Sequence, residues 1–143
     1  MKKLHIHIKT KDLDQSVAFY TTMFGTAPTR LEADYAKWLL DDPAANVSLS
    51  THAGAAGVDH LGISVDSREA LDEIAERLSQ AGSSLFEEEA TTCCYAQSNK
   101  YWARDPQEAV WELFQTFGDS DTYGAEPERE LTPPHRPSAA ACC

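Results

Sequence analysis

The sequence is poor in basic residues and in long apolar runs. It has 12 Lys and Arg against 23 Asp and Glu in 143 residues, a formal net charge of −11. This deficit argues against a nucleic-acid groove or an anionic membrane surface as the partner. No apolar run approaches the length of a membrane span. Only a few apolar residues follow the basic start Met1-Lys2-Lys3, so we expect no signal peptide and a cytoplasmic protein.

Cysteine occurs only four times, as the adjacent pairs Cys93-Cys94 and Cys142-Cys143. Neighbouring Cα atoms lie roughly 3.8 Å apart, which is below the usual disulfide range, and a bridge between them closes a strained ring. Because no export signal is expected, we interpret all four as free thiols in a reducing compartment.

The most informative feature that is present is a histidine that recurs in the same local setting. His5 lies in an alternating apolar run at residues 3–9, and His60 lies in a second such run at residues 58–65. This alternation predicts strands whose aliphatic side chains face one way and whose histidines face the other. A helix-start signal follows each run, and aligning the two histidines aligns both helices without a gap. The sequence therefore indicates an internal repeat.

Each copy of the repeat predicts one βαβββ module, so we expect an α+β fold with two curved sheets around a shared cavity. In module one, residues 1–52, Asp12 or Asp14 caps a helix that runs to about Phe24 and Gly25 ends it. Its strands are expected at residues 3–9, 29–32, 35–41 and 46–51.

Module two, residues 57–117, repeats the pattern. Asp66-x-x-Glu69 resembles a capping box and Gly82 ends the helix. Its strands are expected at residues 58–65, 84–87, 99–104 and 109–116. We expect a single domain over residues 1–117 and a flexible tail over residues 118–143, where proline and small residues replace the periodic pattern.

Glu112 is the candidate third partner of the two histidines. It lies between bulky apolar residues in the last predicted strand, where a charge needs a partner. Together with His5 and His60 it gives two imidazoles and one carboxylate, an arrangement associated with non-haem Fe(II) and open coordination positions. The alternative for Glu112 is a purely structural role in a buried ion pair. We interpret the remaining histidines, His7, His52 and His135, as structural or surface residues. Asp59 and Glu108 become candidate ligands only if the strand parity is off by one.

Cys93 and Cys94 form a candidate binding site of a different kind. On a regular strand the two thiols point to opposite faces, so the segment must form a loop for both to hold one atom. Thiolates are soft ligands, and two adjacent ones suit a trivalent centre such as As(III). The alternative is an incidental buried pair. We further expect residues 91–100 to be a mobile loop that closes on arsenic, and truncation after Phe117 to leave turnover largely unaffected.

The double βαβββ pattern with paired histidines resembles the vicinal oxygen chelate (glyoxalase/bleomycin resistance/dioxygenase) superfamily over residues 1–117. Within it, several stretches are similar to the carbon–arsenic lyases and cadmium-induced proteins. They are residues 35–38, 57–62, 90–96, 105–107 and 111–112, together with Lys100 and Trp102. One departure is Glu108-Ala109-Val110, where the family often has a glycine after Pro-Gln.

This resemblance implies an Fe(II)-dependent dioxygenase that cleaves the carbon–arsenic bond of trivalent organoarsenicals, such as methylarsenite, and releases arsenite. It implies His5, His60 and Glu112 as metal ligands, Cys93 and Cys94 as the catalytic and substrate-binding pair, and O2 as co-substrate. Two alternatives stay open. One is a non-enzymatic cadmium- or arsenite-binding resistance protein, and the other is a glyoxalase-like metalloenzyme of the same superfamily. The sequence gives no oligomeric partner.

Overall fold

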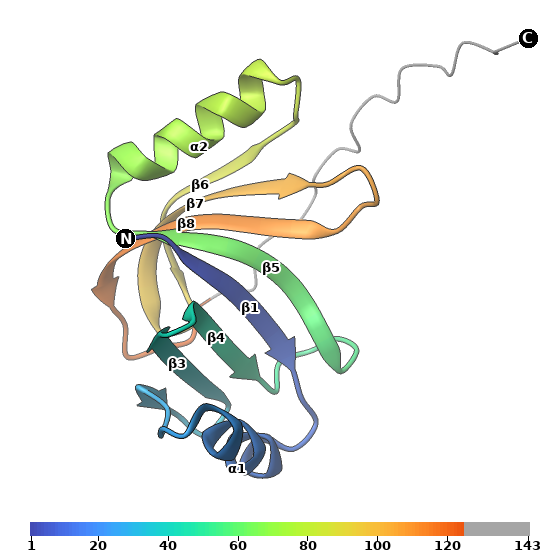
Figure 1. The fold of residues 1–143 in the computed structure, drawn as a ribbon, viewed down its shortest axis with the longest axis vertical. Helices are drawn as coiled ribbons and strands as arrows, with labels where there is room; N and C mark the ends of the chain where they lie inside the picture. Colours follow the sequence, from blue (N-terminus) through green and yellow to red (C-terminus); the bar gives the residue numbers. More distant parts are fainter. Residues whose placement is uncertain (125–143) are drawn as a thin grey trace, which may run out of the picture.

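A curved sheet of eight strands, with two helices on its outer face, carries the whole architecture in the computed structural model, which describes residues 1–124 (Figure 1). The strand order is β2-β3-β4-β1-β5-β8-β7-β6. The elements of module one are β1 Lys3–Lys9, α1 Leu13–Phe24, β2 Arg30–Leu31, β3 Tyr35–Asp41 and β4 Ala44–Ser50. Those of module two are β5 Gly57–Val65, α2 Arg68–Gln80, β6 Phe86–Cys93, β7 Ala96–Arg104 and β8 Val110–Asp119.

The two modules join at the middle of the sheet. Strand β1 pairs antiparallel with β5, while β1 pairs parallel with β4 and β5 pairs parallel with β8. The predicted α+β fold of two βαβββ modules is therefore confirmed, but the two sheets expected as separate are joined through β1 and β5 into one curved sheet. In Figure 1 the helices α1 and α2 lie outside opposite ends of the curve, which leaves the concave face for a site.

Helix α1 begins and ends at the predicted residues. The Asp12 carboxylate accepts a hydrogen bond from the Gln15 backbone N–H at 2.9 Å, and Gly25 ends the helix in the left-handed conformation, with φ of 68°. Its inner face packs on Trp38, which is fully buried, through Tyr20 and Phe24. The core of module one is thus largely aromatic next to the helix.

Helix α2 differs from the prediction at its first residue. The N-cap is Ser67, whose hydroxyl accepts the Ala70 N–H at 3.2 Å, so the expected capping box at Asp66 is wrong by one residue. Serine and aspartate are both good N-caps, and their adjacency makes the choice ambiguous from sequence. The helix packs Leu71 and Ile74 over Val65, in an aliphatic core.

Strands β6 and β7 are longer than predicted. They run to Cys93 and from Ala96, so residues 91–100 form a β-hairpin and the expected loop there is wrong. The hairpin is partly exposed and therefore carries many polar residues, so its sequence lacks the apolar alternation that predicts a strand. Strand β8 continues to Asp119, and Tyr123 and Gly124 pack against the hairpin, so the described fold extends past residue 117. Residues 125–143 of the expected tail lie outside the described part of the chain.

Neither α1 nor α2, the helices within residues 1–124, has the length and apolar character needed to cross a membrane.

Candidate metal and thiol site

Three polar side chains from neighbouring strands converge on the concave face. His5 lies on β1, His60 on β5 and Glu112 on β8, and all three are buried. One carboxylate oxygen, Oε2 of Glu112, lies 3.4 Å from His5 Nε2 and 3.2 Å from His60 Nε2. The structure therefore brings the three predicted residues together at one point.

Gly62 makes this convergence possible. It pairs with His5 across β1 and with Glu112 across β8, so it separates the two in the sheet. A Cβ atom at this position would lie 2.2 Å from the Glu112 carbonyl oxygen. Only glycine leaves room for the close approach of β5 and β8 under the site.

The ring orientations leave one nitrogen of each histidine facing the centre. His5 Nδ1 lies 3.0 Å from the Asn46 carbonyl oxygen, and His60 Nδ1 lies 2.8 Å from the Asp59 carboxylate. Both acceptors require a proton on Nδ1, so the lone pair is on Nε2. This is the arrangement of metal-binding histidines, which donate their other ring N–H to a carbonyl or a carboxylate.

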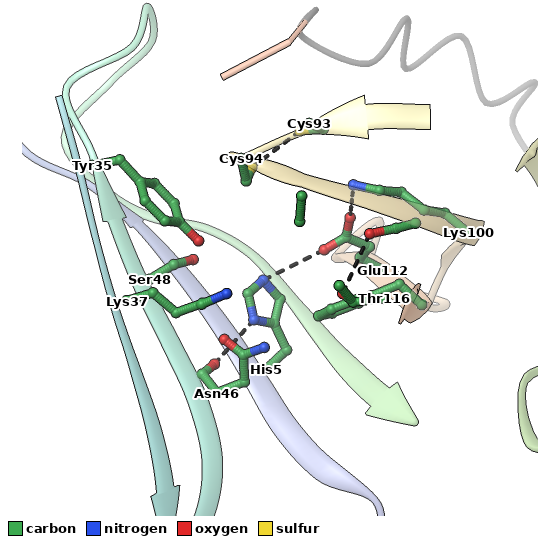
Figure 2. Close-up of a pocket in the computed structure, with 13 residues that line it drawn as sticks. His5, Tyr35, Lys37, Asn46, Ser48, Cys93, Cys94, Lys100, Glu112 and Thr116 are labelled. Carbon is green, nitrogen blue, oxygen red and sulfur yellow. Dashed lines mark hydrogen bonds and ion pairs between the residues drawn. The ribbon is translucent and has the colours of Figure 1, made fainter. Parts of the chain in front are cut away.

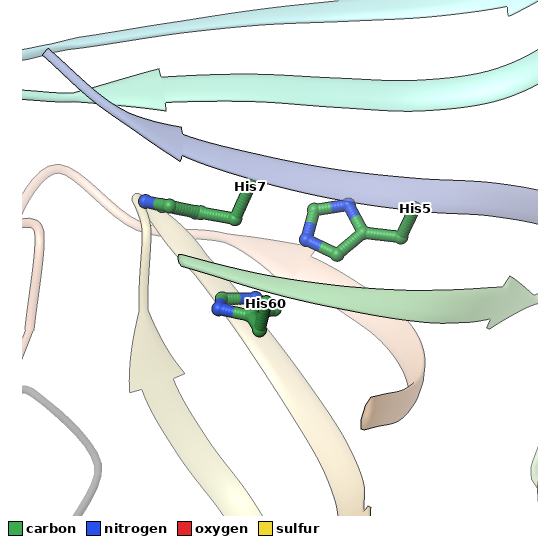
Figure 3. Close-up of side chains that lie close together, drawn as sticks. All are labelled: His5, His7 and His60. Atoms are coloured by element: carbon green, nitrogen blue, oxygen red, sulfur yellow. The ribbon is translucent and has the colours of Figure 1, made fainter. Parts of the chain in front are cut away.

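His7 also faces the site, although the sequence was interpreted as giving it a structural or surface role. Its ring stacks on His60 with centroids 4.8 Å apart (Figure 3). One ligand nitrogen from each of His5, His7 and His60 lies within 4.8 Å of the others. Both nitrogens of His7 are within hydrogen-bond distance of serine hydroxyls, Ser50 at 2.8 Å and Ser48 at 3.0 Å. The strand parity that places His5 inside places His7 there too, and that signal could have identified it.

Burial keeps the imidazoles of His5 and His7 neutral. It lowers the pKa of His5 to about 4, which the nearby Glu112 only partly offsets. It lowers the pKa of His7 to about 3, with a further lowering by His60 and His5. Neutral nitrogen donors and a carboxylate fit a divalent transition metal, so the chemistry of this donor set is compatible with Fe(II).

Lys100 is the buried partner of Glu112. Its ammonium lies 2.6 Å from Oε1 of Glu112, so the second carboxylate oxygen is already engaged. Burial alone would raise the pKa of Glu112, but Lys100, His60 and His5 hold it well below its usual value. Burial likewise would lower the pKa of Lys100, but Glu112, Cys93 and Cys94 raise it above its usual value. Glu112 is therefore ionised and offers one free oxygen to the centre.

A tight turn holds the two thiols on the same side. Cys93 ends β6, and the turn residues Cys94 and Tyr95 both have positive φ, 58° and 60°. Positive φ at both central residues defines the type I′ hairpin turn, which normally prefers Asn-Gly. The sulfur atoms of Cys93 and Cys94 lie 3.0 Å apart, and neither cysteine forms a disulfide. A hydrogen bond with Cys93 and burial raise the pKa of the Cys94 thiol well above its usual value.

The thiols and the polar cluster share one small cavity of about 30 Å³ (Figure 2). Its lining includes His5 and Glu112 of the polar cluster, both cysteines and Tyr35. A cavity of this size holds roughly one or two water molecules.

Tyr123, which no sequence pattern predicted as part of the site, lies beside the Cys94 thiol. The Tyr123 hydroxyl lies 3.6 Å from the Cys94 sulfur, and its ring stacks on His52 with centroids 3.5 Å apart. Tyr35 and Tyr95 pack against the same ring. Tyr123 follows the last predicted strand in a polar stretch, and no periodic signal marks it.

The other candidates lie elsewhere. Asp59 binds Nδ1 of His60 rather than facing the centre, and His52 pairs with Asp34 at 2.9 Å. Glu108 is exposed in the turn between β7 and β8. His135 and the pair Cys142-Cys143 lie outside the described residues.

A curved sheet of paired βαβββ modules with polar donors on its concave face defines a class of protein. Residues 3–113 match the model of the Glyoxalase/Bleomycin resistance protein/Dioxygenase superfamily. The chain belongs to this superfamily, which confirms the resemblance expected from the sequence.

Several relatives are similar over the full length of the chain. The probable trivalent organoarsenical cleaving enzyme of Bacillus subtilis (strain 168) is 35% identical over 146 residues, covering 100% of both chains. The trivalent organoarsenical cleaving enzyme of Thermomonospora curvata is 33% identical over 151 residues, with the same coverage. The cadmium-induced protein CadI of Mycobacterium bovis is 30% identical over 144 residues, covering 100% of this chain and 93% of its own.

Solved structures share the fold at low identity. One is a Mn(II)-bound glyoxalase from Novosphingobium aromaticivorans, with a TM-score of 0.59 and 19% identity over 90% of this chain and 44% of that one. Another is homoprotocatechuate 2,3-dioxygenase from Arthrobacter globiformis, with a TM-score of 0.60 and 16% identity over 83% of this chain and 37% of that one. This chain spans less than half of either, and the likeness concerns the fold.

Proposed function

We propose that this protein is a cytoplasmic, Fe(II)-dependent dioxygenase that cleaves the carbon–arsenic bond of trivalent organoarsenicals and releases arsenite. One observation carries the proposal: two thiols 3.0 Å apart face the same cavity as His5 and Glu112. The relatives named as organoarsenical cleaving enzymes support it. Arsenic detoxification is the proposed biological role.

His5, His60 and Glu112 are the proposed metal ligands, through Nε2 of each histidine and Oε2 of the carboxylate. Fe(II) held there would supply a site for O2 binding and activation. Burial keeps the His5 imidazole unprotonated, and Asn46 and Asp59 fix the tautomers of His5 and His60. Lys100 prevents Glu112 from binding through both oxygens.

Cys93 and Cys94 are proposed to bind the arsenic by condensation. Each thiol forms one S–As bond, and each thiol proton leaves with one arsenic hydroxyl as water, so two water molecules are released per arsenical. The organic substituent stays on arsenic. Because the two sulfur atoms already lie together, binding fixes the arsenical beside the cluster of ligands, which makes the following step intramolecular.

The cavity of about 30 Å³ is too small for an organoarsenical, so the site must open. The segments that can open it are the turn at Cys94 and Tyr95, and the covering residue Tyr123. Their return would exclude water before the reaction.

The overall reaction balances for methylarsenite with O2 as the oxidant. CH3As(OH)2 and O2 give As(OH)3 and formaldehyde, so that carbon loses four electrons, O2 gains four and arsenic stays trivalent. The experiment is to load the protein with Fe(II) without oxygen, add methylarsenite, admit O2 and quantify arsenic species, formaldehyde and O2. We expect arsenite and formaldehyde in equal amounts, formed only after O2 is admitted.

The chain offers a matched control for the thiols. Cys93→Ser or Cys94→Ser should abolish methylarsenite binding and leave Fe(II) binding nearly unchanged. The double change Cys142→Ser with Cys143→Ser removes the other cysteine pair and should retain activity. Arsenite release without O2, or undiminished release in Cys94→Ser, would contradict the proposal.

A second candidate is a soft-metal binding protein without turnover, which the thiol pair and the relatives named cadmium-induced protein favour. It predicts tight Cd(II) or arsenite binding through Cys93 and Cys94 and no consumption of O2. A glyoxalase-like isomerase predicts no need for either thiol. The product analysis above identifies the dioxygenase, and Cd(II) binding that is lost in Cys93→Ser or Cys94→Ser distinguishes the binding protein from the isomerase.

A further inference from the structure

Module two contains a second, larger cavity on the outer face of the sheet. It has a volume of about 490 Å³ and lies between α2 and the strands beneath it. Its walls are largely apolar, formed by Ile74 and Leu78 of α2, Ala103 of β7, and Trp111 and Leu113 of β8. Small-molecule sites are usually cavities of roughly 300–1,000 Å³ with mainly apolar walls.

The corresponding layer of module one contains packed aromatic rings. There the rings of Tyr20, Phe24 and Trp38 contact one another between α1 and its strands, with centroids 5.6 to 6.1 Å apart. The core beneath α2 is mainly aliphatic, with Leu71 and Ile74 at its centre. The two modules therefore differ in the packing between helix and sheet, and the structure shows a cavity of this size beneath α2.

Two arginines give the cavity of module two a positive rim. Arg77 of α2 and Arg104 of β7 both line it. The Arg77 guanidinium has no hydrogen-bond or ion-pair partner within residues 1–124. Arg104 contacts the backbone oxygen of Glu108 at 3.2 Å and its carboxylate at 3.8 Å. The acidic lining residue Asp105 already accepts the backbone N–H groups of residues 107 and 109 at 2.8 and 2.9 Å.

We propose that this cavity binds a compact organic anion, with its apolar body against Leu78 and Trp111 and its anionic group at Arg77 and Arg104. A protein with a formal net charge of −11 repels anions elsewhere on its surface, so a basic rim on an apolar cavity selects for charge as well as shape. The cavity has no cysteine or histidine in its lining, so it is chemically separate from the thiol site.

The cavity also lies behind the candidate metal site. Trp111 and Leu113 face it, while Glu112, between them on β8, faces the concave side, as strand alternation requires. A ligand here therefore contacts the strand that carries Glu112 without touching the metal ligands. The proposal does not depend on the function proposed above.

The test uses 8-anilinonaphthalene-1-sulfonate as the anionic probe and N-phenyl-1-naphthylamine as its uncharged counterpart. Binding is followed by probe fluorescence and by amide shifts of ¹⁵N-labelled full-length protein. We expect saturable binding of the sulfonate, with shifts concentrated at Leu78, Ala103 and Trp111, and at least tenfold weaker binding of the uncharged probe. Equal affinities for the two probes, or shifts spread over both modules, would overturn the proposal.

Two variants and a control locate the site. Arg77→Gln changes an exposed side chain and should weaken sulfonate binding by about tenfold. Ala103→Phe fills the cavity and should abolish binding. Lys11→Gln removes an exposed cation of module one and should leave binding unchanged. If Ala103→Phe does not fold, Arg77→Gln against Lys11→Gln still decides, and equal affinity in those two variants refutes the site.

Discussion

At the residue scale, Glu112 and Lys100 form an ion pair in which both charges are buried. Each keeps the other ionised, as the raised pKa of Lys100 and the lowered pKa of Glu112 indicate. Removing one partner of such a pair leaves an uncompensated buried charge, which costs more than the pair itself contributes.

Glu112→Ala should therefore destabilise the protein by about 3–5 kcal/mol, because it leaves the buried Lys100 ammonium without its carboxylate partner. The double variant Glu112→Ala with Lys100→Met removes both charges and should recover most of that loss. Urea unfolding of the metal-free proteins measures both effects. Equal destabilisation in the single and double variants would mean that the charge of Lys100 is not the cause.

The sequence predicted some residues of the site and not others. Glu112 could be predicted, since a carboxylate between bulky apolar neighbours has no solvent to face. Lys100 could not be assigned a role, because a lysine in a polar stretch resembles a surface residue. His7 has the same parity as His5, but the repeat offers no second copy of it to support a role. The geometry of the site was predicted, whereas the roles of His5, His60 and Glu112 as ligands stay predictions.

At the scale of the element, β5 connects the two halves of the site. It carries His60, and Gly62 lets its neighbour β8 approach closely enough for Glu112 to reach the histidines. The thiols depend on another element, the hairpin of β6 and β7. That turn has no glycine or asparagine, so its sequence lacks the usual signal for a two-residue connection.

Gly62→Ala should disrupt the pairing of β5 with β8, because the added methyl group would lie 2.2 Å from the Glu112 carbonyl oxygen. The strands must separate or shift, and we expect Fe(II) affinity to fall at least tenfold, with a lower melting temperature. Gly82→Ala is a control for destabilisation remote from the cluster, because nothing lies within 4 Å of the added Cβ but the φ of 83° strains an alanine, so the melting temperature should fall without a loss of Fe(II) affinity. Iron titration of both variants gives the comparison, and unchanged affinity in Gly62→Ala would contradict this role.

At the scale of the whole molecule, the repeat determines most of the architecture. The alternation around His5 and His60 predicted both modules and the shared concave face. It could not predict residues 118–124, because the contacts of Tyr123 and Gly124 with the hairpin are long-range and leave no periodic trace.

Truncation separates these residues from the remaining tail. A chain ending at Gly124 should retain its affinity for methylarsenite. A chain ending at Phe117 lacks Tyr123, and its affinity for methylarsenite should change several-fold. This differs from the expectation from the sequence, which was that truncation after Phe117 leaves turnover largely unaffected. Identical affinity for both truncated chains would mean that Tyr123 does not contribute to the thiol site.

Stability of the metal-free protein should depend on pH through the buried histidines. The pKa of His5 falls from 6.5 to about 4 on folding, so the unfolded chain binds more protons between these values. Its contribution is fully present above about pH 6.5 and is lost as the pH falls towards 4, a change of roughly 3 kcal/mol. Denaturant unfolding across this range in chelator measures it, and His5→Gln should give a shallower dependence. A wild-type profile as flat as that of the variant would refute the assignment.

The pairing of β1 with β5 has one further consequence. His5 belongs to the first half of the chain, and His60 and Glu112 belong to the second, so neither half holds a complete set of donors. A bound ion would therefore act as a cross-link between halves that are joined covalently only through residues 51–56. If this connection were cut, metal would govern the association of the two fragments, and a chelator would release them. The stability of the assembled molecule would then depend on the metal concentration.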